Sequence, residues 1–309
     1  MDRLITVIGS YAVGMTIKTN RFPLSGETVP GYGFSVLHGG KGSNQAVAAA
    51  RLGGNVFYYT CVGKDSYGKD AIMLYEQEGV DASAVKLSEN MSTGVGMVAV
   101  NKSGENQIII DIGANNDIGA ADIDKIVPSI KKSSYVLMQL EINIDAVSYI
   151  AALTKKMGIP FILNPAPFHP LTSGVLKCCD FITPNETEAR LLLGLAPDDP
   201  CSNEMLAEKL LSQGVKTAVI TLGSKGALIA DETKCEYVDG KKVNAVDTTG
   251  AGDTFSAAFT VALSEGKKVR EAVEFANCAA ALSVTKYGVV PSLPTRAAVD
   301  KFMQENGYI

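Results

Sequence analysis

A glycine-rich segment that ends in a carboxylate is the strongest chemical signal in this sequence. Residues 247–253 read Asp-Thr-Thr-Gly-Ala-Gly-Asp and lead into an apolar run with helical character. The small residues Gly250, Ala251 and Gly252 would let successive amides at a helix start face one anion. A carboxylate there repels a resting phosphate, unless Asp253 takes the proton from an attacking hydroxyl. The segment favours phosphoryl transfer; the alternative is a glycine-rich turn with Asp253 as a helix cap.

A second glycine-rich segment, near the start of the chain, has the composition of a ligand-binding loop. Residues 38–46 read His-Gly-Gly-Lys-Gly-Ser-Asn-Gln-Ala. Gly39 and Gly40 permit a close backbone approach, while Lys41 and Asn44 offer donors to a polyhydroxylated ligand. The alternative is a loop with a solvated lysine.

Two further segments follow expected strands and have two interpretations each. In Thr-Pro-Asn-Glu-Thr-Glu at residues 183–188, Asn185 is placed to cap a helix. Asn185 and Glu188 would also suit a site for magnesium, water and phosphate, because Mg²⁺ favours oxygen ligands. Residues 221–226, Thr-Leu-Gly-Ser-Lys-Gly, would cover nucleotide phosphates or form a plain hairpin.

Several other chemistries and partners are excluded. There is no P-loop, no G-x-G-x-x-G after the first strand and no G-x-S-x-G elbow. With two histidines and no C-x-x-C pair, a zinc site is not expected. The chain has 28 basic and 33 acidic residues, a net charge of −5 and no basic block, so we expect neither a nucleic-acid nor a membrane partner.

The cysteines and the N-terminus indicate a cytoplasmic protein. Six cysteines are scattered along the chain, as in a reducing compartment where thiols stay free. The apolar run at residues 4–8 is typical of a first β-strand and lacks the features of a signal peptide.

Most of the chain alternates short β-branched runs with helical patterns, which predicts an α/β fold with a mainly parallel sheet covered on both faces. The predicted strands are 5–9, 56–62, 135–140, 161–164, 181–183 and 218–222. The predicted helices are 44–52, 67–79, 144–157, 185–193 and 203–213.

Two stretches, 16–37 and 93–112, lack a helical period and alternate as strands do. We predict that they join as a small β-sheet lid over the carboxyl edge of the main sheet, where ligands of such folds bind. The remaining residues, 1–15, 38–92 and 113–309, would form the α/β core.

Taken together, these blocks resemble the ribokinase-like (phosphofructokinase-B type) carbohydrate kinases across essentially the whole chain, and the ribokinases match best within that family. The matching blocks, in register, are 39–46, 139–141 (Gln-Leu-Glu), 164–167 (Asn-Pro-Ala-Pro), 185–188 and 247–253.

The resemblance implies a three-layer α/β/α sandwich with a β lid, and an ATP- and Mg²⁺-dependent kinase that phosphorylates a primary hydroxyl of a small sugar. Asp253 would be the general base, and the amides of Gly250, Ala251 and Gly252 would form the anion hole. Besides Asp253, sugar-contacting positions would be Gly39, Gly40, Lys41, Asn44 and Glu141. Nucleotide positions would be Asn185, Thr221, Gly223, Ser224, Gly226 and Asn277.

The resemblance also implies metal ions and a homodimer formed through the lid. Glu188 would serve the magnesium ion. The positions matching a monovalent-cation loop, usually for potassium, are Asp247, Thr249, Ser283, Lys286, Gly288 and Ser292. Ligands in that loop are largely backbone carbonyls.

One departure from the family pattern concerns the sugar. Ala12 and Gly14 stand where ribokinases usually have Asn and Asp that bind sugar hydroxyls. Losing one such charge-assisted bond costs about 1.5–3 kcal/mol, so ribose binding should weaken about tenfold or more. The alternatives are a nucleoside kinase, with Tyr11, Ala12 and Val13 as an apolar wall for the base, and a sugar-binding protein without turnover.

Overall fold

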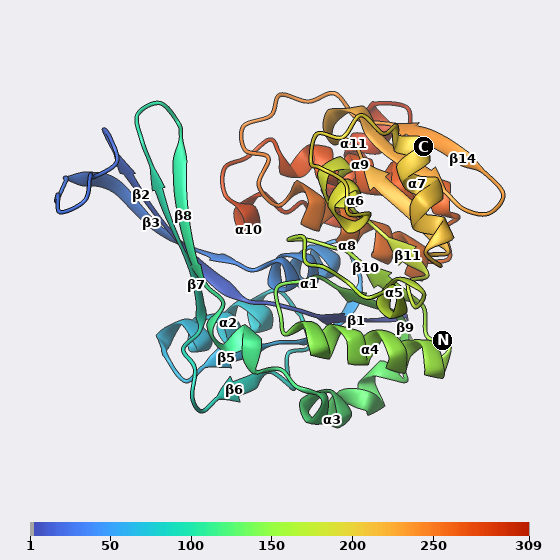
Figure 1. Cartoon of the computed structure of the whole chain (residues 1–309), viewed down its shortest axis with the longest axis horizontal. Helices are drawn as coiled ribbons and strands as arrows, with labels where there is room; N and C mark the ends of the chain where they lie inside the picture. The colour runs from blue at the N-terminus through green and yellow to red at the C-terminus, as the bar shows by residue number, and fades with distance from the viewer. Residues whose placement is uncertain (1–2, 309) are drawn as a thin grey trace.

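A central sheet of eight strands organises the molecule (Figure 1). The computed structural model describes residues 3–308. The strand order is β14-β13-β12-β11-β10-β9-β1-β4; the pairs from β4 to β12 are parallel, and β13 and β14 are antiparallel. The bounds are β1 Leu4–Ile8, β4 Asn55–Tyr59, β9 Ser133–Met138, β10 Phe161–Leu163, β11 Phe181–Ile182, β12 Thr217–Thr221, β13 Gly226–Ala230 and β14 Cys235–Asp239.

Helices cover both faces of this sheet, as the α/β/α prediction requires. One face packs against α1 (Lys41–Arg51), α2 (Ser66–Gln77), α8 (Ala251–Ser264), α9 (Val269–Ser283) and α11 (Arg296–Glu305). The other packs against α3 (Ala120–Ile130), α4 (Ile144–Met157), α5 (Ser173–Leu176), α6 (Glu186–Leu192) and α7 (Asn203–Ser212). Alternation along the strands divides the core: Leu137 of β9 points into the first layer, Val136 and Met138 into the second. Within residues 3–308, none of the helices has the length and apolarity to cross a membrane.

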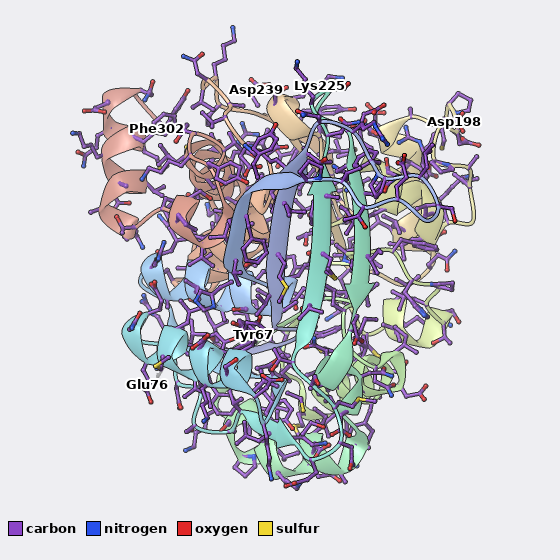
Figure 2. The ribbon with its side chains drawn as sticks, turned by 90° about the vertical axis from the view of Figure 1, so that its left-hand side faces the viewer. Tyr67, Glu76, Asp198, Lys225, Asp239 and Phe302 are labelled. Atoms are coloured by element: carbon purple, nitrogen blue, oxygen red, sulfur yellow. The ribbon has the colours of Figure 1, made fainter. Side chains whose placement is uncertain are left out.

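A second sheet of four strands forms the lid, which stands away from the core in Figure 1 and lies across the front of the molecule in Figure 2. Its order is β3-β2-β7-β8, with β2 and β7 parallel and the outer pairs antiparallel. The bounds are β2 Ala12–Thr19, β3 Gly31–Gly39, β7 Gly94–Val100 and β8 Asn106–Asp111.

The strand bounds of the lid differ from the predicted segment 16–37. Pairing of β2 with β3 begins at Ala12 opposite Gly39, so both strands start at the edge of the core. The small residues at these ends have little β-propensity of their own, and cross-strand pairing places them in the sheet. As a result, two residues of the predicted sugar site, Gly39 and Gly40, lie at the junction of lid and core.

The predicted strand 56–62 is two strands in the structure. β4 ends at Tyr59, and β5 (Cys61–Gly63) leaves the main sheet to pair with β6 (Lys86–Ser88). The division occurs at Thr60, whose carbonyl accepts a hydrogen bond from the Lys86 amide. A continuous apolar run does not reveal such a change of partner, because pairing is non-local.

Candidate active site

Asp253 lies in the first turn of α8, at the carboxyl edge of the parallel sheet, and is 5% exposed. Gly250 begins this helix with φ 80°, and a Cβ there would lie 2.5 Å from Cγ1 of Val289, so both conformation and space require glycine. The Gly250 and Gly252 amides have no hydrogen-bond partner among the described residues, whereas the Ala251 amide donates to Thr248 at 3.3 Å. The helix start therefore presents free donors to an anion beside a carboxylate.

Residues of the early glycine-rich segment surround that carboxylate. Helix α1 begins at Lys41 and brings the Asn44 side chain to Asp253, with Nδ2 2.9 Å from Oδ2. The turn before the helix needs Gly40, which has φ 88° and whose Cβ would lie 2.7 Å from the Ser10 carbonyl. The structure thus brings together two motifs from opposite ends of the chain.

Glu141 is oriented by the same turn. Its Oε2 accepts the backbone amide of Lys41 at 2.8 Å and the hydroxyl of Ser10. Burial alone would lower the pKa of Lys41, but the nearby carboxylates of Asp253, Glu141 and Glu188 outweigh it and raise that pKa. Lys41 is therefore a charged group among three acids, suited to attract an anionic or hydroxylated ligand.

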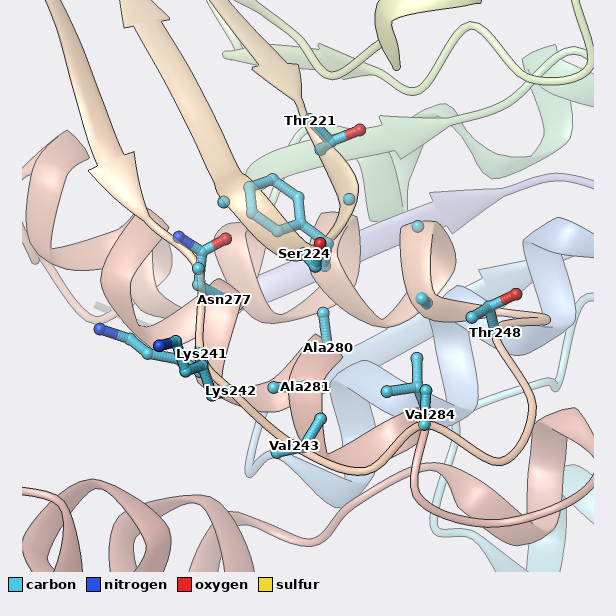
Figure 3. A pocket seen from close by; sticks show the side chains of 17 residues that line it. Thr221, Ser224, Lys241, Lys242, Val243, Thr248, Asn277, Ala280, Ala281 and Val284 are labelled. Carbon is cyan, nitrogen blue, oxygen red and sulfur yellow. The ribbon is translucent and has the colours of Figure 1, made fainter.

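A cavity of about 520 Å³ opens beside the start of α8 (Figure 3). Most of the predicted nucleotide residues line it, namely Thr221, Gly223, Ser224, Gly226 and Asn277, together with Ala251 and Gly252. The segment 221–226 forms a hairpin between β12 and β13, and four of its residues also line this cavity. Gly226 has φ 101°, and a Cβ there would lie 2.0 Å from the Val238 carbonyl, which explains the glycine.

Other walls of this cavity were missed by motif analysis. They are Gly240, Lys241, Lys242, Val243, Ala245, Ala280, Ala281 and Val284. Residues of these types are common in helices and loops, so no spacing signal distinguishes them. In Figure 3 the Asn277 and Lys241 side chains lie at the end of the cavity far from Thr248. The cavity thus runs from the start of α8 to Asn277 and Lys241, with aliphatic side chains along its walls.

Asn185 and Glu188 form a capping box at the start of α6. Asn185 Oδ1 accepts the Glu188 amide at 2.8 Å, and Glu188 Oε2 accepts the Asn185 amide at 2.9 Å. Asn185 does not line the cavity, but it bridges to Thr221, which does. Burial raises the pKa of Glu188, although the hydrogen bond from the Asn185 amide and the positive charge of Lys41 act in the opposite direction.

Among residues 3–308 there is no group of three or more acidic, histidine or cysteine ligands that could hold a metal alone. Glu188 thus fits a magnesium ion held mainly by phosphate and water.

Asp247 joins the two predicted cation-loop segments. Its Oδ1 accepts the Thr249 amide and hydroxyl at 3.0 and 2.7 Å, and its Oδ2 accepts the Gly288 amide at 3.0 Å. Although burial opposes them, these bonds lower the pKa of Asp247. Ser283 and Ser292 donate their hydroxyls to carbonyls of their own helices, and Lys286 is exposed. These side chains are thus engaged or turned outward, which fits a cation held by backbone carbonyls.

The lid face near the site has no polar side chain at the two divergent positions. Leu37 of β3 points toward Gly288, its Cδ1 3.4 Å from where a Cβ would stand. Gly14 pairs with Leu37 in register and therefore shares this face, as does Ala12 two residues earlier. A Cβ at Gly14 would meet only the Leu37 carbonyl, at 3.7 Å.

The suggested apolar wall for a nucleoside base is not formed. Tyr11 is fully buried and bonds to Nδ1 of His38 at 2.8 Å, and Val13 is 2% exposed in the same core cluster. Alternation along β2 turns Val13 away from the face of Ala12 and Gly14. Only Ala12 of the three residues remains on the site side.

Comparison with known proteins places this geometry in a family. Residues 2–296 match the model of the pfkB family carbohydrate kinases. A ribokinase of Haemophilus influenzae is 40% identical over 98% of this chain and 99% of its own length. A deoxyribokinase of Salmonella typhi is 36% identical over 98% of this chain and 99% of its own length. The structure of the Arabidopsis thaliana ribokinase, solved in complex with ribose and ATP, superposes with a TM-score of 0.91 and is 33% identical in sequence. The superposition covers 98% of this chain and 99% of that one.

Proposed function

Since the chain belongs to the pfkB family of carbohydrate kinases, we propose that it transfers the γ-phosphoryl group of ATP to a primary hydroxyl of a small, ribose-like sugar. The observation that carries this proposal is the buried Asp253 beside free amides at the start of α8, where the nucleotide cavity meets the polar residues of α1. The relatives named for ribose and deoxyribose support the substrate class.

In the proposed reaction Asp253 is the general base. The carboxylate takes the proton of the sugar hydroxyl, and the oxygen forms a bond to the γ-phosphorus. The bond from that phosphorus to the β,γ-bridging oxygen breaks, its electron pair stays on ADP, and the sugar leaves as its phosphate ester. The amides of Gly250 and Gly252, with Ala251 between them, stabilise negative charge that develops on the transferred group.

Polar side chains on the core side would orient the sugar. Asn44 donates to Asp253, Lys41 carries a positive charge near that carboxylate, and Glu141 is an acceptor held in place by Ser10 and the Lys41 amide. Gly39 and Gly40 would let the backbone approach the ligand closely. The nucleotide would lie in the cavity of about 520 Å³, its base between the apolar walls and its phosphates toward Thr221, Ser224 and Gly252.

Two metal ions complete the proposal. Bound Mg²⁺ would neutralise charge on the phosphates, with Glu188 contributing to its environment and Asn185 fixing that carboxylate through the capping box. A potassium ion would be held by carbonyls of the two segments that Asp247 joins, next to the anion hole.

The direct test is an ATP-consumption screen. It would cover pentoses, ketoses, deoxy sugars and nucleosides, with magnesium and potassium present, and identify the phosphorylated product. We expect turnover with a small sugar and none with nucleosides, because the apolar wall for a base is missing. Phosphorylation of a nucleoside alone would favour the nucleoside-kinase alternative, and no product from any compound would favour a sugar-binding protein without turnover.

A homodimer formed through the lid is also proposed. The face of the lid opposite Gly14 carries an apolar row across all four strands, in register: Val36, Met15, Met97 and Ile109. Three of these side chains are strongly exposed, Ile109 by 74%, Met97 by 56% and Val36 by 44%. An apolar face of this extent is typical of a surface that a second subunit covers.

A further inference from the structure

A chain of buried amides holds one oxygen of Asp253. Nε2 of Gln45 donates to Oδ1 of Asp253 and to Oδ1 of Asn164, both at 3.0 Å. Oε1 of Gln45 accepts from Nε2 of Gln139. Gln45 is fully buried, and Gln139 and Asn164 are 1% and 5% exposed. Every polar atom of the Gln45 side chain is therefore engaged away from water.

The direction of this chain is fixed. Asn164 Nδ2 donates to the Thr183 carbonyl at 3.0 Å, so Asn164 must turn its oxygen toward Gln45. A flipped Gln45 would place its oxygen against two other acceptors, the Asn164 oxygen and the Asp253 carboxylate. The NH₂ group of Gln45 therefore has to face Asp253, whatever the ligand state.

The main sheet anchors the chain. Gln139, Asn164 and Thr183 each follow directly on the end of a strand, β9, β10 and β11, and these strands are neighbours. Parallel strands bring their carboxyl ends to the same edge, so the anchor points lie side by side where the central sheet ends. Gln45 lies on α1 and connects that edge to α8.

The two oxygens of Asp253 are held unequally. Oδ1 accepts a hydrogen bond from Gln45, which connects it to the sheet. Among the described residues, Oδ2 accepts a hydrogen bond only from Nδ2 of Asn44, at 2.9 Å. Oδ1 of Asn44 is buried without any partner among the described residues. An unpaired buried acceptor is costly, so Asn44 is poised to exchange contacts when a hydroxylated ligand arrives.

We propose that Gln45 is a positioning residue for the transfer step. It fixes Oδ1 of Asp253 so that Oδ2 points at the acceptor hydroxyl and takes its proton. The inference rests on the proposed role of Asp253 as base. It predicts that loss of the Gln45 amide slows the chemical step and leaves nucleotide binding intact, because Gln45 does not line the cavity.

Gln45→Met tests this, since methionine has similar length and no amide. We expect kcat to fall roughly 10- to 100-fold, as for a displaced catalytic group, with an unchanged Kd for ATP measured by calorimetry. KM for the sugar should change less than kcat, because the proposed sugar-contacting residues are unaltered. Lys41, Glu141 and Glu188, the other charged groups near Asp253, are unaltered in this variant.

Ser43→Ala is the matched control. Ser43 lies on the same helix, is fully buried and accepts a bond from Tyr75 at 3.2 Å, without contact to Asp253. It should keep the wild-type kcat. Gln139→Met removes only the outer bond of the chain and should lower kcat roughly 2- to 10-fold.

The outcomes separate this inference from the proposed function. A Gln45→Met enzyme with wild-type kcat would overturn the positioning role, provided that Asp253→Asn is inactive. An active Asp253→Asn enzyme would instead remove the proposed base. If Gln45→Met fails to bind ATP, the Gln139→Met variant provides the test. A wild-type kcat in Gln139→Met would then contradict the inference.

Discussion

Nδ2 of Asn44 lies 2.9 Å from Oδ2 of Asp253, although 209 positions separate these residues in the chain. The contact joins the start of α1 to the start of α8, and so brings the glycine-rich turn at Gly40 next to the one at Gly250. Both turns use positive φ angles that favour glycine. The proposed sugar and phosphate positions therefore share one carboxylate.

Asp253→Asn should fold as the wild type and lose most of its turnover. The amide keeps the shape of the carboxylate and cannot accept the proton, and removal of a general base typically lowers kcat about 10²- to 10⁴-fold. Steady-state kinetics on the best sugar from the screen would measure the loss, with thermal melting and ATP binding as controls. Near-full activity would rule out Asp253 as the base.

Potassium should raise the activity relative to sodium at the same ionic strength. The segment of Asp247 and Thr249 abuts Gly250, so a cation that orders it would preorganise the amides of the anion hole. Rates in KCl and NaCl buffers test this. Asp247→Ala should reduce the difference between the two rates, because it removes the hydrogen bond from the Gly288 amide that joins the two segments. Equal wild-type rates in both salts would remove the cation from the proposal.

The unmodified enzyme should bind ribose weakly, and Gly14→Asp should strengthen ribose binding more than the binding of other sugars. The new carboxylate would restore a charge-assisted hydrogen bond of about 1.5–3 kcal/mol, so KM for ribose should fall about tenfold or more while kcat changes less. Gly14 has no positive φ, and its Cβ position meets only Leu37 at 3.7 Å, so aspartate fits the strand.

Gly96→Asp is the control for that substitution. Gly96 pairs with Gly14 in register on the neighbouring strand, and its Cβ position is open. The control adds the same charge to the same face of the lid and should change KM for ribose less than Gly14→Asp does. Tight ribose binding by the unmodified protein would contradict the prediction and indicate that another residue supplies the acceptor.

Asp65→Ala should destabilise the fold in a pH-dependent way. Asp65 caps α2 through Gly68 and also accepts the amide and hydroxyl of Thr93 at the base of β7; burial opposes these bonds, which nevertheless lower its pKa. A lowered pKa means stability that is present above the unfolded-state pKa and is lost as pH falls through the folded-state pKa. We expect a loss of about 1–2 kcal/mol in urea unfolding at pH 7.

That difference between wild type and Asp65→Ala should shrink as the pH is lowered toward the folded-state pKa. Ser202→Ala is the matched control, since Ser202 caps α7 with a hydroxyl that does not titrate. Its effect on unfolding should not follow the same pH dependence. A constant Asp65→Ala effect across the acidic range would mean that the charge is not involved.

Ile109→Lys should dissociate the proposed dimer without unfolding the subunit. The side chain is 74% exposed and is the most exposed member of the apolar row of the lid, at its end on β8, so a charge there costs little in a monomer and much in a covered interface. Sedimentation analysis of both proteins would measure the mass. Lys102→Ala, in the turn between β7 and β8, is a suitable control, and a monomeric wild type would contradict the proposal.

The sequence by itself determined the chemistry and the architecture. Local patterns carried both: glycines followed by Asp253 indicate an anion site, and alternating strand and helix periods indicate a parallel α/β sheet. Local backbone requirements explain why this works, since Gly40 and Gly250 adopt positive φ angles in close surroundings that a Cβ would clash with.

Only the tertiary structure decided which residues meet. The bonds of Gln45 to Asp253 and Asn164, the apolar walls around Asn277 and the inward face of Tyr11 depend on pairing across long separations in the chain. Glutamine, alanine and valine are ordinary on a helix, and their spacing gives no sign of a partner. A hydrogen bond or a cavity wall exists only at contact distance, and folding of the sheet sets that distance.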